Sequence, residues 1–91
     1  MTDAVTIIPT YNESGNIKNI LENIENLSSK FDVIVVDDNS PDGTGKIVKD
    51  FIAKNKFNFN ISLIERKVKD GLGSAYIEGF KKAISLNYKF I

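Results

Sequence analysis

The sequence predicts an α/β fold built on a doubly wound, mainly parallel sheet. Apolar segments rich in β-branched residues alternate with segments whose apolar residues recur at helical spacing. No repeat, low-complexity tract or internal linker interrupts this alternation. Strands that alternate with helices at such spacing indicate parallel strands joined by right-handed crossovers. The expected order is β-α-β-α-β-α-β over residues 1–91, a length that fits one small domain or a piece of a larger one.

The first expected strand is the β-branched run at residues 4–8, which ends at Pro9. Ser14 and Gly15 then open a segment that predicts the first helix. Its apolar stripe consists of Ile17, Ile20, Leu21, Ile24 and Leu27. The second expected strand, residues 31–36, is mainly apolar without alternation, as expected where both faces of a parallel sheet are covered.

A turn at Asp42 and Gly43 leads into the second expected helix, with Thr44 as the expected N-cap. The apolar stripe of this helix is Ile47, Val48, Phe51 and Ile52. Residues 60–65 form the third expected strand, and a charged, glycine-rich loop follows it. The third expected helix carries a stripe of Ala75, Ile77, Phe80, Ala83 and Ile84. Residues 88–91 begin a fourth expected strand.

Composition excludes several classes of function. The 91 residues include 12 basic and 12 acidic side chains, which gives no support for general nucleic-acid binding or a polybasic membrane anchor. Cysteine and histidine are absent, which excludes disulfides, thiolate chemistry, Cys or His zinc sites and a histidine base. No apolar run approaches the roughly 20 residues of a membrane span. The beginning of the chain lacks the features of a signal peptide, so we expect a cytoplasmic location.

Three polar loops follow the first three expected strands. They read PTYNE from Pro9, DDNSPDG from Asp37 and RKVKDGLG from Arg66. The carboxyl ends of parallel strands lie at one edge of the sheet, where open α/β sheets bind ligands. The sequence therefore predicts a binding site formed by these three loops.

The adjacent acids Asp37 and Asp38 allow several interpretations. They could form a magnesium or phosphoacceptor pair, bind the metal of a nucleotide, or accept hydrogen bonds from a nucleobase or ribose. In the plainest interpretation they only end the strand and form a turn, as Asp often does. The attached SPDGT sequence favours a ligand.

The other two loops also have structural and functional interpretations. Pro9 to Glu13 could be only a strand end and a helix entry, or Tyr11 could stack on a base while Glu13 accepts hydrogen bonds. Gly71 and Gly73 lack the third glycine of a dinucleotide-binding fingerprint, and they follow the third strand. They form either a flexible helix start or a close approach to a phosphate, whose charge Arg66, Lys67 and Lys69 would offset.

Taken together, three stretches resemble family 2 glycosyltransferases of the dolichyl-phosphate (polyprenyl-phosphate) mannose synthase type. They are IIPTYNE from Ile7, VIVVDDNSPDGT from Val33 and RKVKDGLGSAYIEGF from Arg66. The resemblance implies a GT-A fold, with this chain as its Rossmann-like nucleotide-binding half. It also implies a nucleotide-diphosphate-sugar donor, usually GDP-mannose, and transfer of the sugar to a lipid phosphate at the cytosolic face of a membrane.

The resemblance also implies roles for individual residues. Asp37 would support the nucleoside pocket, and Lys69 with the backbone near Gly71 would lie towards the diphosphate. The residues assigned to substrate binding are Pro9, Tyr11, Glu13, Val36, Asp37, Asp38, Lys69 and Gly71. No catalytic residue is assigned.

Two features depart from the family pattern. Asp70 stands before the glycines, where relatives often carry a neutral or apolar residue. The Asp-x-Asp motif of the family would follow the fourth strand, so we expect the ligands of a Mg²⁺ or Mn²⁺ ion beyond Ile91 and an inactive chain.

The resemblance also implies a mechanism. A phosphate acceptor is already anionic, so the transfer needs no strong general base. In-line attack at the anomeric carbon would invert its configuration.

Two alternatives stay open from the sequence. One is a receiver domain like those of response regulators, although their acidic pair ends the first strand rather than the second. The other is a non-catalytic interaction fragment. The first two helices should cover one sheet face and the third should cover about half of the other, with the fourth strand as an open edge, so we expect self-association through an edge strand or the exposed face.

Overall fold

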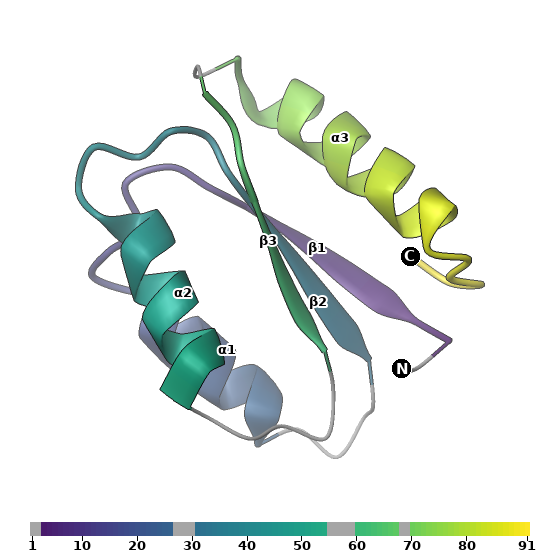
Figure 1. Cartoon of the computed structure of the whole chain (residues 1–91), viewed down its shortest axis with the longest axis horizontal. Coiled ribbons are helices and arrows are strands. Elements are labelled where there is room, and N and C mark those ends of the chain that lie inside the picture. The colour runs from purple at the N-terminus through teal and green to yellow at the C-terminus, as the bar shows by residue number, and fades with distance from the viewer. Residues whose placement is uncertain (1–2, 27–30, 55–59, 68–69) are drawn as a thin grey trace.

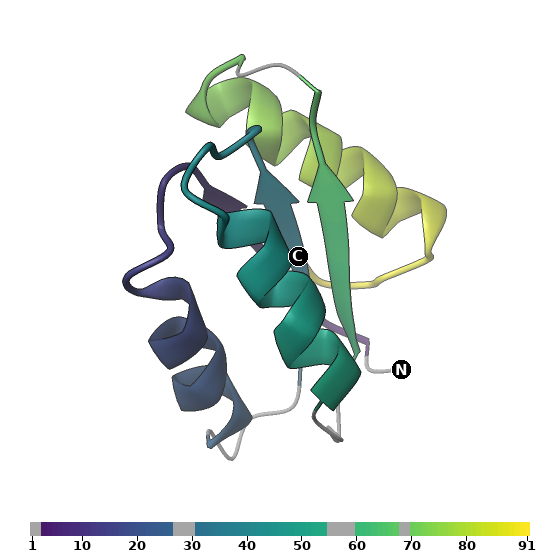
Figure 2. The same ribbon diagram turned by 60° about the vertical axis from the view of Figure 1, so that its left-hand side comes forward.

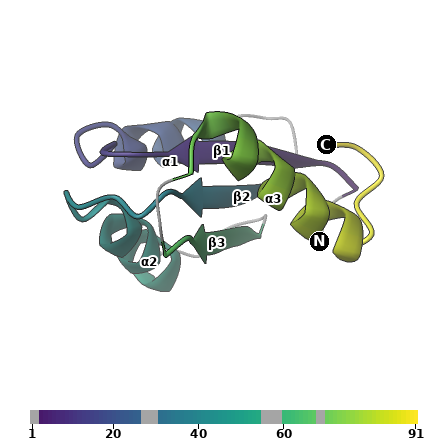
Figure 3. The same ribbon diagram turned by 90° about the horizontal axis from the view of Figure 1, so that it is seen from above.

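The computed structural model describes residues 3–26, 31–54, 60–67 and 70–91. Three parallel strands form one sheet in the order β1-β2-β3 (Figure 3). The strands are β1 (Val5–Thr10), β2 (Asp32–Asp37) and β3 (Ile61–Glu65). The helices that alternate with them are α1 (Ile17–Glu25), α2 (Thr44–Lys54) and α3 (Leu72–Ser85). This arrangement confirms the predicted α/β class with a parallel sheet.

The helices cover the two faces of the sheet unequally. Helices α1 and α2 lie side by side on one face, and α3 lies alone on the other (Figures 1 and 2). Side chains of β2 alternate between these layers, because Val33 and Val35 pack with α1 and α2 whereas Ile34 and Val36 pack with α3. All six residues of β2 are buried, which explains why its sequence shows no polar alternation.

Strand β1 extends further than predicted, because it continues through Pro9 to Thr10. The amide of Val5 donates to the carbonyl of Phe90, on the side of β1 away from β2. Alternate residues of a strand point the same way, so the nitrogen of Pro9 also faces away from β2. Its missing N–H therefore costs no bond of the β1–β2 ladder, and proline is tolerated within the strand.

The fourth strand predicted at residues 88–91 is reduced to a single parallel bridge between Ala4 and Phe90. The segment is held mainly by other contacts, since Asp3 accepts from the amides of Lys89 and Phe90. The Tyr88 hydroxyl donates to Asp32 at 2.6 Å. The bridge still places this segment beside β1, on the side away from β2. The chain therefore builds the sheet from β1 to β3 and then returns to the other side of β1.

The buried face of α3 differs from the predicted stripe. Small residues form it: Ala75, Gly79 and Ala83. A Cβ atom at Gly79 would lie 2.5 Å from Cγ2 of Ile7, so the helix packs closer to β1 than larger residues allow. The prediction was therefore wrong for the three larger residues of the stripe, which are exposed: Ile77, Phe80 and Ile84.

The predicted stripes of the first two helices pack against the sheet, except at Ile20, where the prediction was wrong because its side chain is exposed. Ile17 and Leu21 of α1 are buried, and so are Val48 and Phe51 of α2. Leu27 lies outside the described residues. Thr44 is the first residue of α2 rather than its N-cap, and the Asp42 carboxylate accepts its amide at 3.0 Å. None of the described helices is both long enough and apolar enough to cross a bilayer.

Candidate functional site

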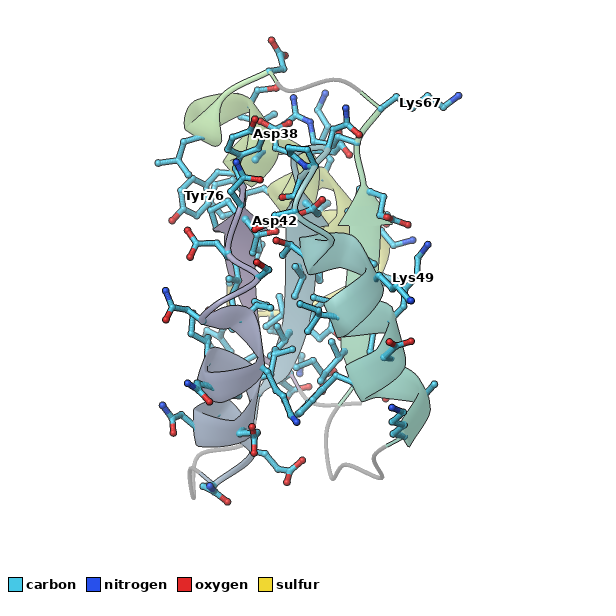
Figure 4. The ribbon with its side chains drawn as sticks, turned by 90° about the vertical axis from the view of Figure 1, so that its left-hand side faces the viewer. Asp38, Asp42, Lys49, Lys67 and Tyr76 are labelled. Atoms are coloured by element: carbon cyan, nitrogen blue, oxygen red, sulfur yellow. The ribbon has the colours of Figure 1, made fainter. Side chains whose placement is uncertain are left out.

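The carboxyl ends of the strands surround a cleft of about 380 Å³, which we call the strand-end cleft. Loops after all three strands and the first turn of α3 meet there, and Figure 4 shows Asp38 at this end of the sheet. Its volume falls within the range typical of small-molecule sites, about 300–1,000 Å³. The lining residues are Pro9, Thr10, Tyr11, Glu13, Asp38, Gly71, Leu72 and Ala75. Five of them were predicted from the sequence: Pro9, Tyr11, Glu13, Asp38 and Gly71.

Asp37 and Asp38 belong to different sides of the sheet, because neighbouring residues of an extended chain point in opposite directions. Asp37 faces the α2 side, where it accepts from Thr10 Oγ1 and Ser40 Oγ, both at 2.7 Å. It also accepts from the Ser40 amide at 3.0 Å. These bonds make Asp37 an anchor for the loop after β2, and it does not line the strand-end cleft.

Asp38 faces the α3 side and lines the cleft. Its carboxylate accepts from the amides of Asp70 and Gly71, both at 3.1 Å. Nε of Arg66 lies 3.2 Å from Oδ1 of Asp38. Asp38 thus joins the end of β2 to the loop that enters α3.

The loops after β1 and β2 are tied together by hydrogen bonds from backbone to side chain. Three consecutive amides of the first loop donate to three side chains of the second. The bonds are Asn12 N to Ser40 Oγ at 2.9 Å, Glu13 N to Thr44 Oγ1 at 3.0 Å and Ser14 N to Asp42 Oδ2 at 3.0 Å. Asn12 has a φ of 55°, which suits the sharp turn the chain makes after Tyr11. This cross-brace fixes the backbone that carries Tyr11 and Glu13.

Asp42 is the most strongly perturbed acid of the cross-brace. Its carboxylate accepts from the hydroxyl and amide of Thr44 and from Ser14. These bonds favour the charged form, with the Thr44 hydroxyl contributing most, and lower the pKa of Asp42 to about 2. The carboxylate is therefore charged at neutral pH and holds both loops.

The remaining predicted site residues lie elsewhere. Val36 is fully buried beneath α3, and Lys69 falls outside the described residues. Lys67 extends outward, away from Asp38 (Figure 4). Arg66 is buried in ion pairs with protein acids rather than free to meet a phosphate.

A second hollow, of about 440 Å³, lies between α1 and α2. It is lined mainly by charged residues of the two helices: Lys18, Glu22, Glu25, Ile47, Asp50, Phe51 and Lys54. Among the described residues, none from a loop at a strand's carboxyl end lines it, whereas groups from three such loops converge on the strand-end cleft. We therefore take the smaller hollow as the candidate site.

The described residues do not fit a divalent cation. Among them, no three His, Cys, Asp or Glu side chains gather closely enough to hold a metal ion. The adjacent acids do not form a pair, because Asp37 is engaged by Thr10 and Ser40 on one face of the sheet. Asp38, on the other face, is already paired with Arg66.

Sequence reasoning missed two parts of the site. The cross-brace was not predicted, because Ser40, Asp42 and Thr44 were interpreted as a turn, a helix cap and a sign of a ligand, and not as hydrogen-bond partners of the first loop. Leu72 was interpreted only as part of the glycine-rich loop and Ala75 only as a helix residue, although both form the α3 wall of the cleft. The convergence of strand ends is the one signal that could have suggested contacts between the first two loops.

Comparison with known proteins places the chain among glycosyltransferases. The sequence matches Glycosyl transferase family 2 over residues 5–85. An uncharacterized protein of Methanocaldococcus jannaschii is 43% identical over 88 residues, which are 96% of this chain and 37% of that protein. Undecaprenyl-phosphate mannosyltransferase of Micrococcus luteus is 40% identical over 84 residues, 92% of this chain and 33% of that protein. Polyprenol monophosphomannose synthase of Mycolicibacterium smegmatis is 33% identical over 87 residues, 96% of this chain and 32% of that protein.

The chain spans about a third of the length of these curated relatives. No solved structure matches it at a significant level. The family match covers nearly all of the sequence and includes every strand and helix described above. The chain therefore belongs to Glycosyl transferase family 2.

Proposed function

We propose that this chain supplies the nucleoside-binding part of a transferase that moves mannose from GDP-mannose to a polyprenyl or dolichyl phosphate. The observation that carries the proposal is the strand-end cleft, where Tyr11, Glu13 and Asp38 converge from two strand ends. The relatives named as polyprenyl-phosphate mannosyltransferases support the choice of sugar and acceptor.

The chemistry of the cleft suits a nucleoside better than a diphosphate. The Tyr11 ring offers a flat apolar surface on which a base can stack. Ionised carboxylates only accept hydrogen bonds, so Glu13 and Asp38 match the N–H and O–H groups of a base and ribose. The same carboxylates would repel phosphate oxygens.

The diphosphate is proposed to lie towards Gly71 and the start of α3. The first amides of a 14-residue helix point outward and favour anions. Gly71 has a φ of 88°, a conformation that glycine adopts without strain. Lys69, outside the described residues, is proposed to face the same phosphates.

In the proposed transfer, an oxygen of the acceptor phosphate attacks the anomeric carbon of mannose as its bond to the nucleoside diphosphate breaks. The acceptor oxygen is anionic near neutral pH, so no protein base has to remove a proton. In-line attack inverts the anomeric configuration. We assign no step to Mg²⁺ or Mn²⁺ because the described residues do not fit either ion. The proposed role of the described residues is to bind and orient the nucleoside.

Nucleotide titration tests the proposal. GDP or GDP-mannose added to the isotopically labelled 91-residue chain should shift the NMR signals of Tyr11, Glu13 and Asp38. Asp38→Ala should abolish these shifts, because it removes a hydrogen-bond acceptor that lines the cleft. Asp50→Ala is the matched control, since Asp50 is an acid of α2 that lines only the second hollow. No response to GDP, UDP or ADP would contradict the proposed function.

A further inference from the structure

Arg66 has an unusual position for an arginine beside a binding site. Its side chain is only 7% exposed, and that of Asp38 is 6% exposed. Buried arginine and aspartate are rare unless they pair with each other, because each loses its hydration. The burial of both partners therefore makes the geometry of their contact important to whatever Asp38 does.

The guanidinium of Arg66 connects three parts of the chain. Nε lies 3.2 Å from Asp38 at the end of β2. Nη2 donates to Ser74 Oγ in the first turns of α3 at 2.8 Å, and lies 3.3 Å from the Asp70 carboxylate. A planar guanidinium holds several acceptors in a fixed relative orientation, which a lysine ammonium does not. Arg66 thus fixes the end of β2 against the start of α3.

The same contacts define the wall of the strand-end cleft. Asp38 also accepts the amides of Asp70 and Gly71, so the carboxylate that faces the cleft is oriented by Arg66 and by two backbone donors. Without Arg66, Asp38 would keep a buried negative charge with no cationic partner among the described residues. That charge would draw in water or turn the carboxylate towards solvent.

We propose that Arg66 is the positioning residue of the nucleoside site, acting through Asp38 rather than on the ligand. It holds the carboxylate and the backbone of Asp70 and Gly71 in the arrangement that a nucleoside meets. It also offsets part of the negative charge of Asp38, which weakens the repulsion of phosphates carried by a nucleoside. The part that concerns affinity rests on the proposed function, whereas the ordering of the cleft wall does not.

Removing the guanidinium tests the proposal by two measurements. Arg66→Met should raise the Kd for GDP by about tenfold or more, at a temperature where the variant is folded. It should also speed amide hydrogen exchange at Asp70 and Gly71 in the absence of nucleotide, while exchange at Val35 in the centre of β2 stays unchanged. A residue that only stabilised the fold would lower the melting temperature without changing the Kd of the folded protein.

A double-mutant comparison and a matched control sharpen the result. If Arg66 acts through Asp38, then Arg66→Met together with Asp38→Asn should bind GDP no more weakly than the weaker single variant. Lys49→Met is the control, because Lys49 forms a 2.6 Å ion pair with Glu65, next to Arg66, through exposed side chains. Figure 4 shows Lys49 on α2, away from Asp38. Its Kd and amide exchange should match those of the wild type.

Arg66→Lys decides the question if Arg66→Met does not fold. It keeps the charge but not the planar fork, so we expect an intermediate Kd and partial loss of protection at both amides. Wild-type Kd and wild-type exchange in the variant that folds would overturn the proposal. If the wild-type chain binds no nucleotide, the proposed function fails, and the exchange measurement alone decides whether Arg66 orders the cleft wall.

Discussion

At the scale of single residues, the two adjacent acids at the end of β2 have separate surroundings. The sequence raised both as candidates for one site, and only Asp38 lines the strand-end cleft. Asp37 is committed to Thr10 and Ser40 on the other face. Strand alternation could have predicted that the two side chains diverge. It could not have predicted which partners each would find, because those partners come from distant parts of the chain.

The acidic side of the stability profile should depend on Asp42. Its pKa falls from 3.8 to about 2 on folding, so its contribution is complete above about pH 4 and is lost as the pH falls towards 2. Asp42→Asn should therefore flatten the decline in melting temperature between pH 4 and 2. Thermal unfolding at several pH values measures this. Asp50→Asn on α2 is the control, and equal slopes for the two variants would contradict the assignment.

The alkaline side should depend on Tyr88. Burial, and then the hydrogen bond to the charged Asp32, raise the pKa of Tyr88 from 10.0 to about 12. A raised pKa stabilises the fold fully below about pH 10 and stops doing so as the pH rises through 12. Tyr88→Phe should lower stability by about 1 kcal/mol at pH 8. The difference from wild type should shrink between pH 10 and 12 in urea unfolding, and a constant difference would count against this pair.

At the scale of elements, α3 shows where sequence patterns succeed and fail. Its existence and approximate bounds follow from the sequence, because apolar residues recur at helical spacing. Its buried face does not, because the pattern gives weight to Ile77, Phe80 and Ile84, whereas the sheet accepts the small face at Gly79. The distance between a helix and a sheet depends on both surfaces, and one helix sequence describes only one of them.

Two glycines of α3 should respond in opposite ways to the same substitution. Gly79→Ala should destabilise the fold by about 1–3 kcal/mol, because the new methyl group meets Ile7 at 2.5 Å. Gly73→Ala meets nothing within 4 Å and should stabilise the helix by about 0.5 kcal/mol. Urea unfolding of both variants tests the close packing of α3. A neutral Gly79→Ala would show that the helix can move away at little cost.

At the scale of the whole molecule, the exposed apolar surface is the main departure from an ordinary isolated domain. Much of it lies on the outer side of α3 and at the bridged segment. The exposed large apolar residues there are Leu72, Tyr76, Ile77, Phe80, Ile84, Phe90 and Ile91. The rings of Tyr76 and Phe80 are stacked, with centroids 6.2 Å apart. Apolar patches of this kind usually mark a surface that contacts another molecule or segment.

We expect this surface to drive self-association, since a net charge of zero opposes it little. Light scattering at about 50 µM should give a mass above that of the 10.1 kDa monomer. Replacing Ile77 and Ile84 by lysine together should restore the monomer if the α3 face is the contact. Association that survives this change would instead indicate an edge strand of the sheet, β1 or β3. A wild-type monomer would contradict both routes.

The order of the elements and the place of the site could be predicted at this scale, because parallel topology brings every strand's carboxyl end to one edge. The reduced fourth strand could not, because Tyr88, Phe90 and Ile91 favour strands, but the amides of Lys89 and Phe90 donate to Asp3. A strand forms only where a neighbouring strand offers backbone hydrogen bonds. The local sequence does not show how far such a neighbour extends.

Pro9 sets a limit on any strand that adds to the open edge of β1. The Val5 amide already donates to Phe90, so such a strand could accept from the Ile7 amide, but Pro9 has no N–H to give and the hydrogen bonding stops where Pro9 lines the cleft. An added strand can therefore pair with the first part of β1 without continuing its hydrogen bonds to the carboxyl end of the sheet. Pro9 therefore keeps the cleft, where a ligand would enter, separate from the edge of β1 that another strand could occupy.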